Sequence, residues 1–330
     1  MLIDKELTEN ILINPAKQGA DHLKIIAGYA TPQMASWHIQ RLNDLYIQPV
    51  KIDLVVGMVP GNGVNLVLHE GFLDVINRYK ISEGYSSFKC QYIYKGLPVH
   101  SKLYLWEKNG VLVDAFIGSA NYTQNAFNSR NQRECMSRIP ISEAISRYFD
   151  KVESDSIYCN SGEIEEFVKL YSTDKDNLTL AEEISQNYNS TNRIKLSLLT
   201  SKGDKVGERS GLNWGQREKR ERNQAYIPLP RKMAKSGFFP IRKNGEEKAP
   251  HFTVLTDDSK SLVLRVEQEG DKAITTPENN SRLGEYFRNR LGLPNGSPVT
   301  LEDLNRYGRT DVEFIKLDEE QYYMDFSVRK

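Results

Sequence analysis

The first half of the chain alternates short apolar segments with longer helical ones, and this alternation restricts the possible folds more than any other feature. Residues 23–29 (LKIIAGY) are typical of a buried strand, because they are short, apolar and β-rich. Thr31 and Pro32 then form a helix start, a capping residue before a proline at the first helical position. We expect further elements in this half: a helix to about Tyr46, a strand at 51–58, a helix at 66–79, a strand at 88–94 and a mostly helical segment at 141–171.

A hairpin follows the third strand. Asn109 and Gly110 are the strongest two-residue hairpin signal, and they separate apolar segments at 102–107 and 111–117. Interleaved strands and helices followed by a hairpin predict an α/β domain, in which helices cover a mixed sheet.

The second half has a different pattern. Short strands between turn residues dominate it, at 225–228, 252–257, 261–267, 312–317 and 321–327, with one clear helix at 282–291. This pattern predicts a small β-rich domain, a barrel or a sandwich. A polar segment, with a short helix expected at 180–188, connects the two halves. The expected organisation is a first domain at 1–172, a linker at 173–192 and a second domain at 193–330.

Composition narrows the function classes. The formal net charge is zero, so a nucleic-acid function has to be argued from local patches or from a site. No apolar run is long enough to span a bilayer, and no signal segment is visible. Cys90, Cys135 and Cys159 are scattered, without the spacing of a metal site or a disulfide framework. We therefore expect a cytoplasmic protein with reduced thiols, no bound metal and no membrane partner.

The residues that carry chemistry begin with His100 and Lys102. On a strand, residues two apart project from the same face, about 6–7 Å from each other. A nucleophile or proton carrier beside a fixed cation suits a phosphodiester, whose non-bridging oxygens carry the charge to be stabilised.

Three further candidates follow within 32 residues of Lys102. The turn at 118–119 ends a strand and opens a helix, so its backbone N–H groups and the side chains of Ser119 and Asn121 can supply donors to an anion. Glu134 would orient one imidazole nitrogen and leave the other to attack.

The order HxK, then GSxNxT, then NxxE resembles the phospholipase D superfamily, and most closely its nuclease branch, over roughly residues 20–150. The resemblance implies that His100 forms a covalent phosphohistidine and that no cofactor is required for the hydrolysis. It also implies that Lys102, Ser119 and Asn121 hold the phosphate and that Glu134 positions His100. The acidic residue five positions after the lysine, Asp in many members, is Glu107 here.

His22 and Lys24 also stand two positions apart, but no GSxNxT motif follows them, and no lysine stands two residues after His38, His69 or His251. Only one complete set of the motifs is therefore present. The family's chemistry uses two histidines, one that attacks and one that protonates the leaving oxygen. A single copy therefore predicts a homodimer with one composite active site.

The second half contains a locally basic segment at 202–248, which is densest at 211–222 (GLNWGQREKRER). Arg and Lys meet phosphates or guanine, and Asn and Gln read adenine, so this mixture suits contact with double-stranded DNA. A solvated charged loop is the alternative. The candidate DNA-binding residues are Asn213, Trp214, Gln216, Arg217, Lys219, Arg220 and Arg222, and in a second cluster Asn279, Asn280 and Arg282.

For the second cluster the alternative is ordinary helix amphipathicity. Leu283, Phe287 and Leu291 would then form the buried stripe, and the arginines of residues 282–290 would form the exposed face.

Three segments of this half, GLNWGQR, SRLGEYFRNRLGL and YGRTDVEFIKLDEEQYYMDF, resemble the recognition domain of phospholipase-D-type restriction endonucleases. That domain is similar to the plant B-three pseudobarrel, which grips the major groove with two arms. The resemblance covers roughly residues 195–330 and implies one arm near Arg217 and the other at 279–282. Some members of the family work with a separate ATP-dependent helicase-like subunit. This chain has no Walker motif, and the need for such a partner stays open.

The leading hypothesis is a type II-like restriction endonuclease, a homodimer that cuts double-stranded DNA at a specific sequence. One alternative is a phospholipid or other phosphodiester hydrolase, which predicts an apolar groove or a membrane-binding face. The other is a non-catalytic DNA-binding protein that uses the nuclease fold as a dimerisation scaffold. The Arg-rich second half favours DNA over the first alternative. The intact set of His100, Lys102, Asn121 and Glu134 argues against the second.

Overall fold

A computed structural model of the chain describes residues 2–80, 86–128, 133–171, 192–242, 249–258, 260–277, 279–317 and 319–328. The chain divides into two compact units, residues 1–173 and 174–330, and each unit is described by itself. Except for residue 192, the expected linker at 173–192 lies outside the described residues, and so does its expected helix at 180–188. No helix within the described ranges is long and apolar enough to cross a membrane.

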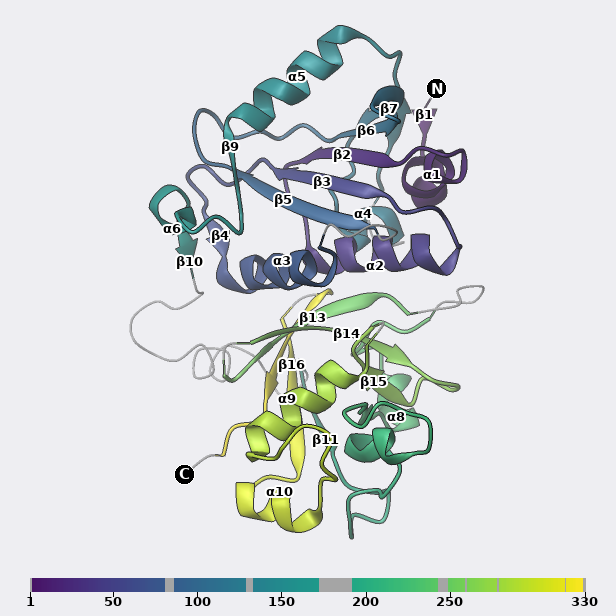
Figure 1. Ribbon diagram of the computed structural model, residues 1–330, viewed down its shortest axis with the longest axis vertical. Helices are drawn as coiled ribbons and strands as arrows, with labels where there is room; N and C mark the ends of the chain where they lie inside the picture. The colour runs from purple at the N-terminus through teal and green to yellow at the C-terminus, as the bar shows by residue number, and fades with distance from the viewer. Residues whose placement is uncertain are drawn as a thin grey trace. The chain divides into compact units, whose positions relative to one another are not determined.

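The first unit is built on an eight-stranded mixed sheet (Figure 1). The strand order is β1-β8-β7-β6-β2-β3-β5-β9, in which β2, β3 and β5 run parallel and the other neighbours pair antiparallel. A separate parallel pair joins β4 to β10. The strands are β1 (Leu2–Ile3), β2 (His22–Ala27), β3 (Lys51–Val56), β4 (Val64–Asn65), β5 (Ser87–Ile93), β6 (Leu103–Lys108), β7 (Val111–Gly118), β8 (Met136–Arg138), β9 (Ser156–Tyr158) and β10 (Leu170–Tyr171).

Helices cover both faces of this sheet, α2 and α3 on one and α5 on the other (Figure 1). The two-residue period of a strand explains this, because Leu23 and Ile25 of β2 belong to one core while Ile26 packs in the other core with Phe149 of α5. The prediction of an α/β domain in which helices cover a mixed sheet is confirmed. Its helices are a π-helical segment η1 (Thr8–Ile13), α1 (Asn14–Lys17), α2 (Pro32–Asp44), α3 (Leu66–Arg78), α4 (Gln124–Asn128), α5 (Glu143–Ser154) and α6 (Ile164–Phe167).

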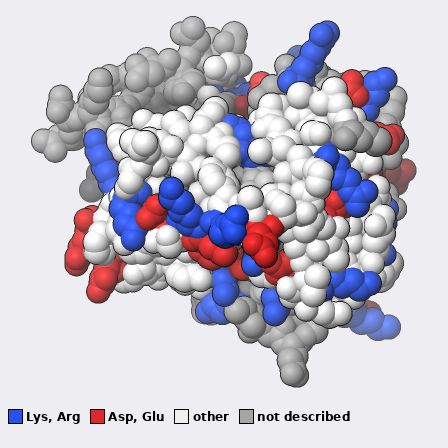
Figure 2. All heavy atoms as spheres, turned by 90° about the horizontal axis from the view of Figure 1, so that it is seen from above, with Lys and Arg blue, Asp and Glu red and all other residues white. Residues whose placement is uncertain are grey.

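The surface on the α5 side carries charges of both signs. Figure 2 shows Lys and Arg side chains alternating with Asp and Glu side chains along a band across this face. On α5, Arg147 pairs with Glu143 at 3.3 Å one helical turn away. Such a mixed surface has no strong attraction for a polyanion.

Two details of the first unit were predicted with different success. The hairpin between β6 and β7 is confirmed, and Asn109 and Gly110 have the positive φ angles (51° and 77°) that a type I′ turn requires. The prediction of a mostly helical segment at 141–171 holds for α5 and the short α6 but is wrong just after Ser154. There the chain forms β9, which pairs with the exposed edge of β5 (Gln91 opposite Tyr158), so sheet pairing overrides helix propensity.

The second unit is a seven-stranded sheet in the order β11-β16-β17-β13-β14-β15-β12, antiparallel except between β13 and β17. Its edge strands β11 and β12 approach each other, so the sheet nearly closes into a barrel, and the predicted pseudobarrel is confirmed. The rings of Phe239, Phe252, Phe314 and Tyr322 pack together inside it. The elements are β11 (Arg193–Ser197), a 3₁₀ helix η3 (Gly211–Gln216), β12 (Ile227–Pro228), α8 (Arg231–Ala234), β13 (His251–Thr256), β14 (Ser261–Glu267), β15 (Ala273–Thr275), α9 (Ser281–Leu291), α10 (Leu301–Tyr307), β16 (Asp311–Lys316) and β17 (Gln321–Asp325).

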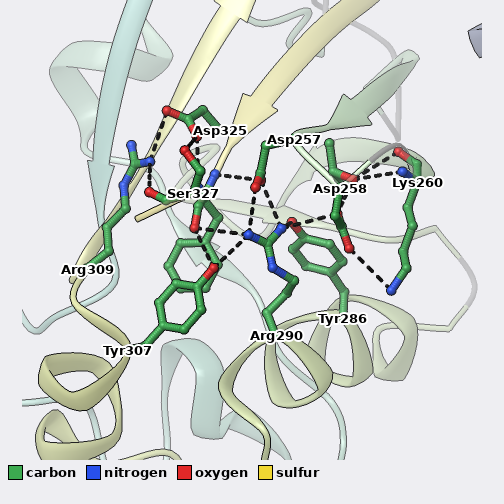
Figure 3. A network of polar contacts seen from close by, with 11 residues as sticks. Asp257, Asp258, Lys260, Tyr286, Arg290, Tyr307, Arg309, Asp325 and Ser327 are labelled. Atoms are coloured by element: carbon green, nitrogen blue, oxygen red, sulfur yellow. Dashed lines mark hydrogen bonds and ion pairs between the residues drawn. The ribbon is translucent and has the colours of Figure 1, made fainter. Parts of the chain in front are cut away.

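Helix α9 is fastened to the sheet through Arg290, at the centre of a polar network (Figure 3). The Arg290 guanidinium donates to both carboxylate oxygens of Asp257 (2.9 and 2.6 Å), which follows β13. The rings of Tyr286, Tyr307 and Phe326 surround it at 5.6–5.8 Å, the range of cation–π contacts. The alternative interpretation, in which the arginines of α9 form its exposed face, is therefore wrong for Arg290.

It is also wrong for Arg288, which is fully buried. Its guanidinium donates only to backbone carbonyl oxygens, of which four lie outside α9 and one, that of Gly284, lies one turn earlier in the helix. The acceptors are Leu212, Arg222, Asn223, Gly284 and Ser297.

Candidate active site and DNA-binding surface

The candidate catalytic residues gather where β2 and β7 of the first sheet end and β6 begins, a region here named the catalytic edge. Strand β2 ends there, and the antiparallel β6 begins there, with Ile26 opposite Leu103. Strand β7 returns to the same edge, where Gly118 lies opposite Met136, the first residue of β8. Three short segments therefore meet at this point. The HxK residues lie just before β6, the GSxN residues at the end of β7, and the glutamate just before β8.

His100 and Lys102 precede β6 instead of lying in it, but their side chains converge as predicted. Lys102 Nζ lies 3.2 Å from His100 Nε2 and donates to the His100 carbonyl oxygen at 2.7 Å. Because an ammonium only donates, this contact leaves the lone pair of the imidazole on Nε2. Lys102 is buried (5% exposed), and burial lowers its pKa from the ordinary value, while the charge of Glu134 opposes this shift.

Ser119 and Glu134 contact each other. The Ser119 hydroxyl donates to the Glu134 carboxylate and accepts from the backbone N–H of Cys135 at 3.0 Å. The sheet edge thus holds Glu134 through a serine that was predicted to bind phosphate. Within the described ranges, no group of three or more His, Cys, Asp or Glu side chains is placed to hold a metal ion.

Asn121 is held by the end of β2. Its Oδ1 accepts from the backbone N–H of Tyr29 at 3.0 Å, so its NH₂ group is the part that could donate to an anion. Asn121 is half-buried, as expected for a side chain oriented by backbone contacts.

Sequence reasoning missed three residues of this edge, namely Gly28, Tyr29 and Gly57. A Cβ on Gly28 would lie 3.1 Å from His100 Cδ2 and 3.5 Å from Asn121 Oδ1, so the backbone there adjoins both candidate catalytic groups. A Cβ on Gly57 would lie 1.9 Å from the carbonyl oxygen of Val99, whose N–H donates to the Gly57 carbonyl at 3.0 Å. Both glycines directly follow buried parallel strands, where ligand sites of open sheets lie, and that position was a usable signal.

In the second unit, the basic stretch after η3 is exposed at Arg217, Lys219, Arg220 and Arg222. The Arg220 guanidinium lies 4.0 Å from the centroid of the Trp214 ring, a cation–π contact that orders this loop.

Two residues of the predicted DNA-reading set have structural roles instead. Asn213 is buried (3% exposed), and its amide both donates to the Val299 carbonyl oxygen and accepts from the Val299 N–H, each at 2.7 Å. Gln216 is half-buried and donates to the Gly296 carbonyl oxygen at 3.0 Å. Because both polar atoms of the Asn213 amide are used in this way, Asn213 cannot read a base edge, and its prediction as a DNA-binding residue is wrong.

The second predicted cluster lies beside the first. The Ala225 N–H donates to the Asn280 carbonyl oxygen at 3.1 Å, and the Ser281 hydroxyl donates to Glu221 of the basic loop. Asn279 is exposed and Arg282 half-buried at the start of α9. The structure thus brings the two predicted arms into one neighbourhood.

Two family models match successive parts of the chain. The NgoFVII restriction endonuclease N-terminal PLD (phospholipase D) domain matches residues 5–166, and the NgoFVII C-terminal B3-like (B-three-like) DNA-binding domain matches residues 186–318. Among curated protein sequences, none matches the chain.

Solved structures similar to the chain include NucT, a phospholipase D family member and a polyphosphate kinase. NucT from Helicobacter pylori is 18% identical, with a TM-score of 0.33, over 48% of this chain and 97% of its own. Nuc from Salmonella typhimurium, a phospholipase D family member, is 10% identical, with a TM-score of 0.30, over 49% and 89%. Polyphosphate kinase from Porphyromonas gingivalis is 12% identical, with a TM-score of 0.32, over 56% and 28%.

The two family models together span both compact units, in the order in which the catalytic edge and the basic loop occur. The chain therefore belongs to the NgoFVII family of restriction endonucleases, DNA-cutting enzymes that join a phospholipase D domain to a B3-like DNA-binding domain.

Proposed function

We propose that the protein is a type II-like restriction endonuclease that hydrolyses double-stranded DNA at a specific sequence, in the cytoplasm where its substrate lies, without a divalent metal. The observation that carries this proposal is the pairing of His100 Nε2 with Lys102 Nζ at 3.2 Å. The pair supplies a nucleophile and a positive charge at one point, the two functions that a metal ion and its bound water provide elsewhere.

The reaction proceeds in two displacements. His100 Nε2 attacks phosphorus, the bond from phosphorus to the leaving oxygen breaks, and a proton passes to that oxygen. Water then attacks the phosphohistidine, breaks the phosphorus–nitrogen bond and releases the imidazole. Lys102 and the Asn121 NH₂ group stabilise the negative charge on the non-bridging oxygens in both steps.

The proton for the leaving oxygen comes from a second copy of the chain. Only His100 and Lys102 are followed by the GSxNxT and glutamate positions, whereas His22, two residues before Lys24, is paired with Asp53 and Glu107. Two histidines are needed, so the partner's His100 acts as the acid at a composite site. His100 is exposed at the sheet edge, which allows this approach. Both strands are then cut by successive turnovers of one site.

The second unit selects the target. Arg217, Lys219, Arg220 and Arg222 with the start of α9 form the proposed DNA-binding surface, in which Asn279, Asn280 and Arg282 are the second arm. Contacts from this surface to phosphates would make DNA binding weaken with rising salt concentration, and contacts to base edges would give sequence specificity.

The test is cleavage of plasmid DNA in excess EDTA by wild type, His100→Ala and the control His22→Ala. His22 is a partly buried histidine at the opposite end of β2, paired with Asp53. We expect wild type and control to cut and His100→Ala to be inactive. Loss of wild-type cutting on chelation would refute the metal-free mechanism, and cutting by His100→Ala would remove His100 from the site.

Where a helicase-like partner is required, it is added with Mg²⁺ and ATP in place of EDTA. The test is then whether His100→Ala cuts under conditions in which the wild type cuts. Sedimentation of the active enzyme as a monomer would refute the composite site.

A further inference from the structure

A pocket of about 440 Å³ opens beside the catalytic residues, at the carboxyl ends of β2 and β3. Gly28 and Tyr29 belong to its wall and also contact the catalytic edge. The Tyr29 N–H holds Asn121, and the Tyr29 ring meets the His100 imidazole edge-on, with centroids 6.3 Å apart. Whatever occupies the pocket therefore lies next to the group that attacks phosphorus.

The lining of the pocket is aromatic and neutral. The lining includes the aromatic residues Tyr29, Phe72, Tyr92 and Tyr171, of which Tyr29 and Tyr171 are exposed, and the loop residues 61–63. None of the described lining residues is charged. Burial raises the pKa of Tyr92, so its phenol also stays neutral.

This chemistry discriminates between possible occupants. A phosphate requires cations or several convergent N–H donors, and those stand at Lys102 and Asn121, outside the lining. A flat, uncharged ring with polar edges gains from aromatic stacking and from a few amide contacts. A nucleobase is such a ring, and it is covalently attached to the phosphate that His100 attacks.

We propose that this pocket receives the nucleobase of the nucleotide next to the scissile phosphate, unstacked from the duplex, with Tyr29 as its stacking partner. The proposal rests on the proposed function. Tyr29 is 48% exposed, so a base can reach its ring while the phosphate remains between His100 and Lys102. Unstacking costs free energy, which is lowest for a mismatched base, and stacking on the pocket rings offsets it.

The experiment measures binding without cleavage. The full chain is titrated with 2-aminopurine deoxyriboside, a fluorescent nucleoside without a phosphodiester, excited beyond the tryptophan absorption. Four proteins are compared: wild type, Tyr29→Ala, Asn62→Trp and Tyr158→Ala. Tyr29→Ala removes the stacking ring, and Asn62→Trp fills the pocket from an exposed loop position. Tyr158→Ala is the matched control, since Tyr158 is 44% exposed and lies on β9 outside this pocket.

We expect wild type and Tyr158→Ala to quench the probe equally, and the other two variants to bind it about tenfold more weakly or worse. Inorganic phosphate should not displace the nucleoside. Equal binding by all four proteins would overturn the assignment, and so would displacement by phosphate.

A separate cleavage assay separates this proposal from the proposed function. A mismatch at the base pair next to the cut should raise the single-turnover rate of the wild type, and this gain should vanish in Tyr29→Ala. If the wild type cuts DNA while all four proteins bind the nucleoside equally, only the pocket assignment fails. If the nucleoside binds in a Tyr29-dependent way but no DNA is cut, the nuclease proposal fails and the pocket keeps its ligand class.

Discussion

Replacing Arg288 with alanine should destabilise the second unit and release the basic loop that we propose contacts DNA. Arg288 is fully buried in α9, and its guanidinium makes five hydrogen bonds of 2.8–3.3 Å to backbone carbonyl oxygens. Two of these acceptors, Arg222 and Asn223, end the basic loop, and a third, Leu212, lies in η3. One side chain thus ties the loop, η3 and the turn at Ser297 to the helix.

The magnitude follows from the groups left behind. A buried polar group without a partner costs about 1–3 kcal/mol, so two of the five carbonyls left without donors would cost about 2–6 kcal/mol. The substitution also removes the desolvation cost of the buried guanidinium, which offsets part of this loss of stability. The same desolvation lowers the pKa of Arg288. We expect a net loss of about 3 kcal/mol in the free energy of unfolding, which lowers the melting temperature by roughly 6–12 °C for a domain of about 150 residues.

The assay combines thermal unfolding with hydrogen exchange of peptides from residues 211–223. The control is Arg306→Ala on α10, whose side chain is 62% exposed and pairs with Asp303, a surface contact worth about 0–1 kcal/mol. Arg288→Ala should melt early and exchange faster in the loop, whereas Arg306→Ala should do neither. A melting temperature equal to that of the control, with unchanged loop exchange, would refute the reasoning.

Three further predictions concern the catalytic edge. Gly28→Ala places a Cβ 3.1 Å from the His100 ring and should slow single-turnover cleavage by about 10²-fold, with little change in melting temperature; an unchanged rate would contradict the close approach. Maleimide should label Cys135, which is exposed beside the site, and block cleavage, whereas Cys90 should resist because burial raises the pKa of its thiol; peptide mass spectrometry distinguishes the two. Burial lowers the pKa of Lys102, so its charge, present below that pKa, should be lost as pH rises, and single-turnover cleavage should decline at a lower pH than about 10.4, the value of an ordinary lysine. A rate that stays flat to pH 10.4 would contradict this.

The elements of the first unit could be predicted because each carries its own periodic pattern. The predicted strand at 51–58 is β3 (Lys51–Val56), and the predicted helix at 66–79 is α3 (Leu66–Arg78). The segment after Ser154 could not be predicted, because its strand β9 forms only against the free edge of β5. Local sequence does not contain the partner on which such a strand depends.

Helix α9 shows a second limit. Its buried stripe of Leu283, Phe287 and Leu291 follows the helical period and was expected. Arg288 was assigned to solvent, because a charged residue is almost never fully buried unless it is paired. Its partners are backbone carbonyl oxygens, four of them outside α9, and every residue has such an oxygen. No residue type marks them, so the burial of Arg288 is visible only in the fold.

The same reasoning applies to the catalytic edge. The spacing of the motifs predicted that His100, Lys102, Ser119 and Glu134 would lie together, because the residue types of these side chains can be recognised in the sequence. The contribution of Tyr29 to Asn121 is a backbone N–H and leaves no mark in the sequence.

The structure also shows that the roles expected for Ser119 and Glu134 compete. A serine hydroxyl has one proton to donate, and here Ser119 donates it to the Glu134 carboxylate. A phosphate oxygen only accepts, so Ser119 cannot hold phosphate and Glu134 at the same time. The charge of Glu134 raises the pKa of Lys102 and so opposes the effect of burial. This effect depends on the distance between the two groups, so it requires that Glu134 be held in place. We therefore propose that Ser119 serves in this state to position Glu134, and that Lys102 and the amide of Asn121 bind the phosphate oxygens.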